Sequence, residues 1–192
     1  MKIYDISQEV FGCAVFPGDP APKREVISDM NEGALYNLTA FSMCAHNGTH
    51  VDAPRHFYKD GKTLSDMPLD SFIGSAFVHA HEGDVSAADA DEILRKASGC
   101  KHILIKGKAT VTPEAAQVFA ESDIRLLGNE SQTVGPESAP MAVHLTLLKK
   151  EIVLLEGIRL SSVPEGTYLL NAAPIHLGGC DGAPCRAVLI EL

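Results

Sequence analysis

Three histidines and one aspartate fall within a single eleven-residue segment of the chain. The segment reads His46-Asn47-Gly48-Thr49-His50-Val51-Asp52-Ala53-Pro54-Arg55-His56. Imidazole nitrogens and carboxylate oxygens are common ligands of zinc and manganese ions in proteins. The composition of this segment therefore predicts a metal centre. The alternative is a chance grouping of solvated or core histidines.

The spacing within the segment matters because every second side chain of an extended chain faces the same way. The residues that would share a face are His46, His50, Asp52 and His56. At the usual strand rise, His50 and Asp52 would be about 6.6 Å apart, which suits two ligands of one ion. His46 and His50 would be about 13 Å apart on a straight strand, which is too far. We therefore expect the chain to bend at Gly48, since glycine accepts turn and bulge geometries.

A helical arrangement of the same segment is the main structural alternative. His46 and His50 have the spacing of the metalloprotease helix motif His-Glu-x-x-His. That motif requires a glutamate directly after the first histidine, where this chain has Asn47. Gly48 and Pro54 also disfavour a helix through the segment. The sequence thus favours an extended or turning segment over a zinc-protease helix.

Local patterns predict the elements that would hold this segment. We expect strands at Ile3–Ser7, Leu35–Ser42, Ala76–His81, His102–Ile105, Ile124–Leu127, Ile152–Leu155 and Arg186–Leu192. We expect helices at Ala87–Ala97, after Thr112 as N-cap, and from about Glu137 to Lys150. Strands alternate with helices in the middle of the chain, which predicts an α/β fold. We expect one domain over residues 1–192, with a mixed β-sheet and flanking helices.

Composition limits the class of protein. The 192 residues are enough for one domain with a hydrophobic core. The net charge of −9 argues against a nucleic acid or an anionic membrane as partner. No apolar run is long enough to cross a bilayer. The first residues lack the pattern of a secretory signal, so we expect a cytoplasmic protein.

Other chemically active residues carry weaker signals. The five cysteines show no Cys-x-x-Cys spacing, so we expect Cys180 and Cys185 to be ordinary buried or loop thiols. His79 and His81 alternate on one predicted strand, and we expect them on a solvated or edge face. The polar run at residues 129–131 follows a predicted strand and is expected to line a pocket.

The histidine segment also matches a known pattern. His46-x-Gly48-Thr49-His50-x-Asp52-Ala53-Pro54-x-His56-Phe57 resembles the signature of the cyclase family of metal-dependent hydrolases, which includes kynurenine formamidases and isatin hydrolases. Further segments resemble the family in the same order: Tyr4–Ser7, Phe16–Asp19, His144–Leu148, Ile152–Glu156 and Asp181–Ala187. The resemblance thus covers essentially the whole chain. It implies a swivelling β/β/α-like fold, a small-molecule substrate and a homodimer or homotetramer.

The resemblance also implies roles for individual residues. One or two zinc or manganese ions per chain would be held by His46, His50, Asp52, His144 and Glu156. Asp52 would bridge the two ions, and His56 would transfer protons. Phe16 would contact the substrate, at a place where kynurenine formamidases carry a tryptophan. This chain has no tryptophan and a short loop after Ile105, and both departures concern the substrate more than the metal.

The expected reaction follows from these ligands. A metal-activated water would attack the carbonyl of a small arylformamide or cyclic amide and cleave its C–N bond, with His56 as proton shuttle. The alternatives are a lactone or ester hydrolase with the same site, a non-catalytic metal- or ligand-binding protein, and a thiol-dependent redox protein that uses Cys180 and Cys185. His56 favours an enzyme, because binding alone needs no proton shuttle.

Overall fold

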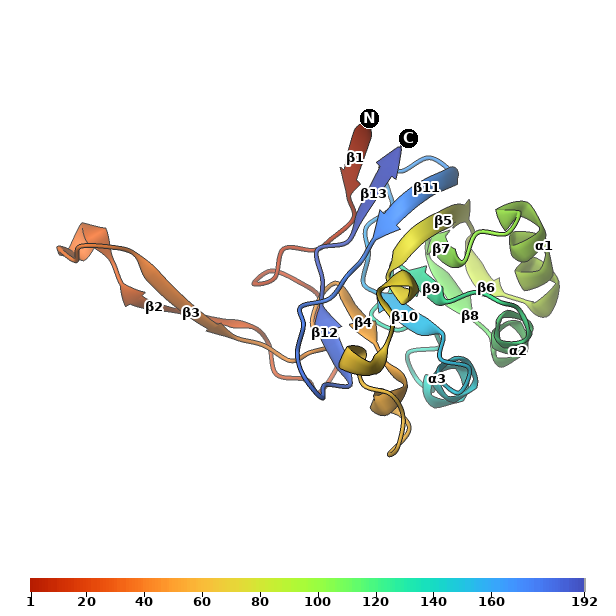
Figure 1. The fold of residues 1–192 in the computed structure, drawn as a ribbon, viewed down its shortest axis with the longest axis horizontal. Coiled ribbons are helices and arrows are strands. Elements are labelled where there is room, and N and C mark those ends of the chain that lie inside the picture. The colour runs from red at the N-terminus through yellow and green to blue at the C-terminus, as the bar shows by residue number, and fades with distance from the viewer. Residues whose placement is uncertain (192) are drawn as a thin grey trace.

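A nine-stranded mixed sheet forms the centre of the computed structural model, which describes residues 1–191 (Figure 1). The strands lie in the order β1-β13-β11-β5-β7-β9-β10-β4-β12. Their bounds are β1 (Lys2–Asp5), β4 (His50–Asp52), β5 (Ile73–Ala80), β7 (His102–Lys106), β9 (Leu126–Asn129), β10 (Val153–Glu156), β11 (Gly166–Asn171), β12 (Gly182–Pro184) and β13 (Val188–Glu191). The last residue of the predicted strand Arg186–Leu192 lies outside the described residues.

Three helices cover one face of the sheet (Figure 1). They are α1 (Ala87–Ala97), α2 (Pro113–Glu121) and α3 (Met141–Leu148). A small parallel pair of strands, β6 (Gly83–Val85) and β8 (Ala109–Val111), lies beside them. Buried apolar side chains fill the space under the helices and form a second cluster on the opposite face. The α/β fold with a mixed sheet and flanking helices is therefore confirmed. None of the described helices is long and apolar enough to span a bilayer.

The helix boundaries show where local signals suffice. The predicted helix Ala87–Ala97 is confirmed, and Thr112 caps α2 by accepting a hydrogen bond from the Ala115 backbone N–H at 3.2 Å. The predicted helix from Glu137 to Lys150 is wrong at both ends. Residues before Pro140 form a turn, and α3 begins only after that proline, whose fixed φ suits the start of a helix.

The prediction that His79 lies on a solvated or edge face is also wrong. Its strand β5 lies inside the sheet, between β11 and β7, and the side chain is only 8% exposed. Its Nδ1 lies 3.0 Å from Glu165 Oε2, so the histidine is buried beside a carboxylate rather than solvated. His81 follows the strand and lies nearer the surface, as predicted.

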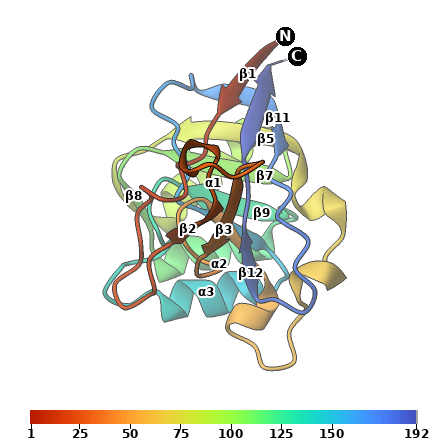
Figure 2. The ribbon, with the colours of Figure 1, turned by 90° about the vertical axis from the view of Figure 1, so that its left-hand side faces the viewer.

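An antiparallel hairpin projects far from the body (Figure 1). It consists of β2 (Lys23–Ser28) and β3 (Leu38–Ser42), and we call residues 23–42 the arm. Figure 2 views the molecule along the arm and shows its strands in front of the body. The predicted strand Leu35–Ser42 is thus three residues too long, and its partner β2 was not predicted.

The short strand β4 holds the centre of the histidine segment. Asp52 lies opposite Leu154 of β10 on one side and opposite Gly182 of β12 on the other. Just before β4, Gly48 has a φ of +64°, and a Cβ at this position would lie 2.8 Å from the Cys13 Cβ. The predicted bend at Gly48 is therefore confirmed, and neither the backbone angle nor the available space suits a larger residue.

We expect Gly48→Ala to destabilise the protein by about 1–3 kcal/mol, because it adds steric overlap with Cys13 to a left-handed backbone. Gly83→Ala is the matched control, since Gly83 also has a positive φ of +83° but no atom near a built Cβ. Chemical denaturation of the metal-free proteins measures both. Equal losses in the two variants would show that the contact with Cys13 contributes nothing.

Candidate metal centre and active site

Five side chains from four parts of the chain surround one small volume. His46 lies in the loop after β3, His50 and Asp52 lie on β4, His144 lies on α3, and Glu156 ends β10. His46 Nδ1 lies 2.8 Å from Asp52 Oδ1, and His144 Nε2 lies 3.2 Å from Glu156 Oε1. His50 Nε2 lies 3.5 Å from Asp52 Oδ1 and 3.4 Å from Glu156 Oε2. The structure thus brings together all five predicted ligands.

Backbone hydrogen bonds fix the direction of these side chains. His50 Nδ1 is 3.0 Å from the Gly48 carbonyl, and His144 Nδ1 is 2.9 Å from the Pro140 carbonyl. Each ring can therefore donate its Nδ1–H to a carbonyl and leave Nε2 facing the carboxylates. The Val134 backbone N–H donates to Glu156 Oε1 at 2.8 Å. Outer hydrogen bonds of this kind are typical of histidine and carboxylate ligands of a metal.

The electrostatics of the cluster also suit a cation. Asp52 and Glu156 are 1% and 2% exposed. Burial raises the pKa of the Asp52 carboxyl, but the hydrogen bond and charge of His46 outweigh it and hold the pKa below the usual range. Burial lowers the pKa of His46 and His144, but their carboxylate partners raise it to about 10 and about 9, respectively. Protonated histidines therefore balance the buried carboxylates, and a divalent ion fits the same place.

Asp52 lies between two groups of potential metal ligands. It belongs to two groups whose ligand atoms lie within 4.8 Å of one another: His46, Asp52 and His56 in one, and His50, Asp52 and Glu156 in the other. Its second oxygen, Oδ2, is 3.7 Å from His144 Nε2. The bend at Gly48 brings the His46 and His50 rings to a centroid distance of 5.2 Å. These contacts make Asp52 the one residue common to both groups.

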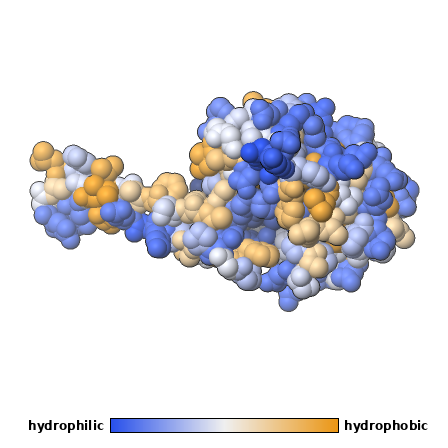
Figure 3. All heavy atoms as spheres, turned by 90° about the horizontal axis from the view of Figure 1, so that it is seen from below, coloured by the Kyte–Doolittle hydropathy of each residue, from blue (hydrophilic) through white to orange (hydrophobic). Residues whose placement is uncertain are grey.

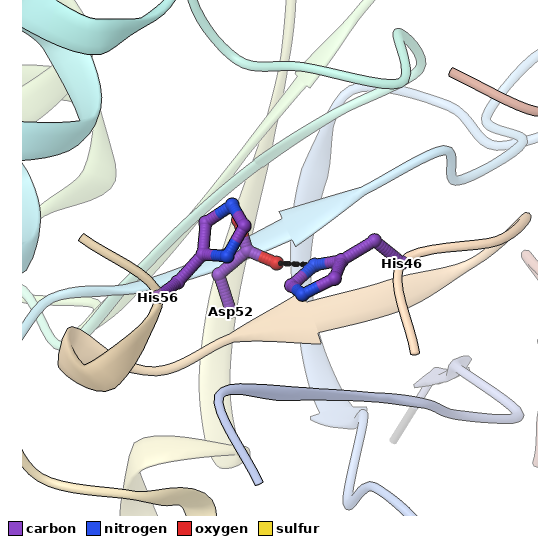
Figure 4. A group of neighbouring side chains, drawn as sticks. All are labelled: His46, Asp52 and His56. Carbon is purple, nitrogen blue, oxygen red and sulfur yellow. Dashed lines mark hydrogen bonds and ion pairs between the residues drawn. The ribbon is translucent and has the colours of Figure 1, made fainter. Parts of the chain in front are cut away.

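His56 lies on a short 3₁₀ turn, Pro54–His56, directly after β4. Its ring stacks at a tilt against His46, with centroids 4.1 Å apart. Figure 4 shows that both rings face the Asp52 carboxylate. The predicted extended geometry therefore holds only for residues 50–52, because Pro54 starts the turn. His56 still reaches the centre.

A cavity of about 260 Å³ opens onto this centre. Its walls include Phe16 and Asp19 from the N-terminal loop, Phe57 after the 3₁₀ turn, and Gln132 and Thr133. Phe16 thus lies at the cavity, as predicted. The prediction that residues 129–131 line the pocket is wrong, because none of them lines this cavity and the side chains of Asn129 and Glu130 hydrogen-bond to backbone groups instead.

Gln132 and Thr133 also line the cavity, although neither was predicted from the sequence. Gln132 Oε1 and Thr133 Oγ1 are buried, and neither has a hydrogen-bond partner among the described residues. Unpartnered buried polar atoms at a cavity are suited to bind a ligand. The signal in the sequence was a polar loop after a strand, but the predicted run ended at residue 131, just before Gln132.

Asp181 is the other residue whose role the sequence analysis did not assign. Its Oδ2 lies 2.9 Å from His46 Nε2 and 3.1 Å from His56 Nδ1. It precedes β12, the edge strand that pairs with β4. The resemblance singled out the segment Asp181–Ala187 but attached no function to it. Only the pairing of β12 with β4 reveals the contact with both histidines.

The cysteines take no part in this centre. All five are free thiols, and none belongs to a metal-capable group within residues 1–191. Burial raises the pKa of the Cys185 thiol to about 12, which disfavours the reactive thiolate. The expectation of ordinary buried or loop thiols at Cys180 and Cys185 agrees with the structure.

The pKa values of His46 and His144 lead to a prediction about metal binding. Both pKa values are raised, so near pH 7.5 an incoming ion must displace their protons. Apparent metal affinity should therefore rise with pH by about tenfold per pH unit for each proton released, up to about pH 9 for the proton of His144 and about pH 10 for that of His46. Calorimetric titration of Zn²⁺ in buffers of different ionisation enthalpy counts those protons. Binding without proton release would contradict the protonated state described for the metal-free cluster.

Comparisons with known proteins agree with this geometry. The sequence model of the Cyclase family matches residues 4–136. Kynurenine formamidase of Erythrobacter litoralis is 35% identical over 204 residues, covering 100% of this chain and 94% of that protein. A solved structure named "The Structure Of Potential Metal-Dependent Hydrolase With Cyclase Activity" has a TM-score of 0.83 and 27% identity, covering 98% of this chain and 96% of that one.

A more distant likeness concerns the fold alone. Isatin hydrolase A from Labrenzia aggregata has a TM-score of 0.85 at 20% identity, covering 100% of this chain and 94% of that one. The family match, the identity along the full chain and the shared fold all point the same way. The chain belongs to the cyclase family of metal-dependent hydrolases.

Proposed function

We propose that this chain is a metal-dependent hydrolase that cleaves the C–N bond of a small amide, either an arylformamide or a cyclic amide. The observation that carries the proposal is the cluster of His50, Asp52, His144 and Glu156, all buried, with the half-buried His46, beside a cavity that His56 also lines. The relative named kynurenine formamidase supports a formamide substrate. A cytoplasmic location and zinc or manganese as the ion are parts of the same proposal.

The ligand set is the one expected from the sequence: His46, His50, Asp52, His144 and Glu156. A divalent ion held there supplies a water that is nucleophilic near neutral pH and polarises the substrate carbonyl. The protein's own side chains perform the remaining tasks. His56 lines the cavity and can carry a proton to the leaving nitrogen, a role that contributes about 10²–10⁴ in rate.

The cavity walls support a small, partly apolar substrate. Phe16 and Phe57 offer aromatic faces, so a planar group can pack between the loop and the turn. Gln132 Oε1 and Thr133 Oγ1 have unused hydrogen-bonding capacity that can orient a polar end. We assign Phe16 the substrate contact expected from the sequence, with a phenylalanine in place of the larger tryptophan.

Hydrolysis of a panel of formamides, cyclic amides, lactones and esters tests the function. We expect wild type to hydrolyse at least one amide, to lose activity in a chelator and to regain it with Zn²⁺ or Mn²⁺. His56→Ala should keep its metal and KM but lose about 10²-fold or more in kcat. Turnover of lactones or esters alone would favour the ester-type alternative, and metal binding without turnover would favour a binding protein. Unchanged kcat in metal-loaded His56→Ala would refute the proton-transfer role.

We also propose that the chain forms a homodimer or homotetramer through the arm. Orange, hydrophobic atoms gather on the arm in Figure 3. The large hydrophobic side chains exposed there, by 46–93%, are Val26, Ile27, Met30, Leu35, Tyr36, Leu38 and Phe41. A two-stranded hairpin is marginally stable by itself. Most of the arm projects away from its own body, which leaves its apolar side chains available to another molecule (Figure 1). A second copy is the partner we assign, because most soluble oligomers are symmetric assemblies of one chain.

Sedimentation at micromolar concentration tests this assembly. We expect a dimer or tetramer for wild type and a monomer for the double variant Ile27→Asp/Leu38→Asp, which puts charges on the apolar surface of the arm. Leu69→Asp is the control, since Leu69 is 68% exposed on the body rather than on the arm. A monomeric wild type would refute the proposal. A double variant that remains oligomeric would show that the arm does not form the interface.

A further inference from the structure

We propose that Asp181 is a positioning residue that orients His46 and His56 together through a single carboxylate oxygen. The inference rests on the proposed function, because it concerns a metal ligand and the proton shuttle of that site. It assigns a role to a residue outside the predicted set of ligands and catalytic groups.

Asp181 contacts only one of the two nitrogens of each histidine ring. Its Oδ2 accepts from His46 Nε2 at 2.9 Å, while His46 Nδ1 faces Asp52 Oδ1 at 2.8 Å. The same Oδ2 accepts from His56 Nδ1 at 3.1 Å, and no hydrogen bond occupies His56 Nε2 within the part of the chain that the structure describes. Asp181 Oδ2 thus binds the outer nitrogen of the proposed metal ligand His46 and one nitrogen of the proposed proton shuttle His56.

This arrangement has a clear chemical use at each ring. A histidine ligand commonly donates its second N–H to a carboxylate, which fixes the ring and makes the ligating nitrogen more basic. Asp181 does this for His46, leaving Nδ1 for the ion. For His56, an acceptor at Nδ1 keeps the proton on that nitrogen and leaves Nε2 free to take or give a proton. A carboxylate in this position also stabilises the imidazolium of His56 after the ring takes up a proton and before it releases one.

The backbone places Asp181 with little freedom. The Ala53 N–H donates to the Asp181 carbonyl at 2.8 Å, and the next residue, Gly182, pairs with Asp52 across β12 and β4. A Cβ at Gly182 would collide with the His46 ring, so the strand packs directly against that ligand. The Asp181 carboxylate therefore sits where β12 meets both histidines.

A double-mutant cycle tests the inference. Asp181→Asn is made in wild type and in His56→Ala, and each protein is measured for Zn²⁺ affinity by chelator competition, for kcat and KM with saturating metal, and for melting temperature. We expect Zn²⁺ affinity to fall about 10–100-fold in both backgrounds, because the His46 contact is lost in each. We expect kcat to fall about 10–100-fold in wild type but to change by less than about twofold in His56→Ala. KM should stay near that of the parent.

Glu165→Gln is the matched control, because it removes the carboxylate beside a buried histidine, His79, outside the centre. It should alter melting temperature at most, and Asp181→Ser replaces Asp181→Asn if the latter does not fold. Unchanged Zn²⁺ affinity would refute the action on His46, and an equal loss of kcat in both backgrounds would refute the action on His56. If wild type hydrolyses nothing in the panel, the proposed function fails, while the affinity measurements still decide the His46 contact.

Discussion

Two carboxylates, Asp52 and Glu156, lie side by side in the core, and their ion-pair partners among residues 1–191 are histidines alone. Ionised carboxylates cost several kcal/mol each to bury unless a cation accompanies them. In the metal-free protein that cation is a protonated imidazole. This requirement explains why three histidines converge here from separate elements, and why their outer nitrogens are already bound to carbonyl groups or to Asp181.

The sheet meets this requirement by placing β4 between β10 and β12. β10 brings Glu156 to the level of His50, while β12 brings Asp181 to the ligand side. Helix α3 then brings His144 to the cavity beside these strands. Four of the five predicted ligands thus lie on strands or a helix, whereas His46, His56 and Asp181 lie in connecting segments. Such a scaffold suits a site that must hold its ligands at fixed distances.

Sequence reasoning found the parts of the site that are close together in the chain. The His46–His56 cluster is a local pattern, and its bend at Gly48 follows from strand geometry alone. His144 and Glu156 lie about one hundred residues away, so only the family resemblance could connect them with the cluster. Helix α1 was located from its helical composition and the Ser98-Gly99 stop that follows it, whereas the start of α3 was missed because a proline turn precedes it.

The remaining features depend on contacts between residues far apart in the chain, which no short stretch of sequence can reveal. Asp181 acquires its partners through the pairing of β12 with β4, and His79 is buried because β5 lies in the middle of the sheet. Strand β2 of the arm escaped prediction for a different reason. It mixes charged and apolar residues and packs against no core, so neither the burial pattern nor the flanking turns marked it.

The pairing of β4 has a consequence for the order in which the molecule assembles. Its partners β10 and β12 follow it by more than one hundred residues, so a long loop must close before either pairing can form. Contacts this distant in the chain form slowly compared with helices and neighbouring strands. The complete set of ligands therefore exists only near the end of folding. An ion that meets the chain earlier finds only His46, His50 and Asp52, so loading of the full centre reports that the sheet has closed.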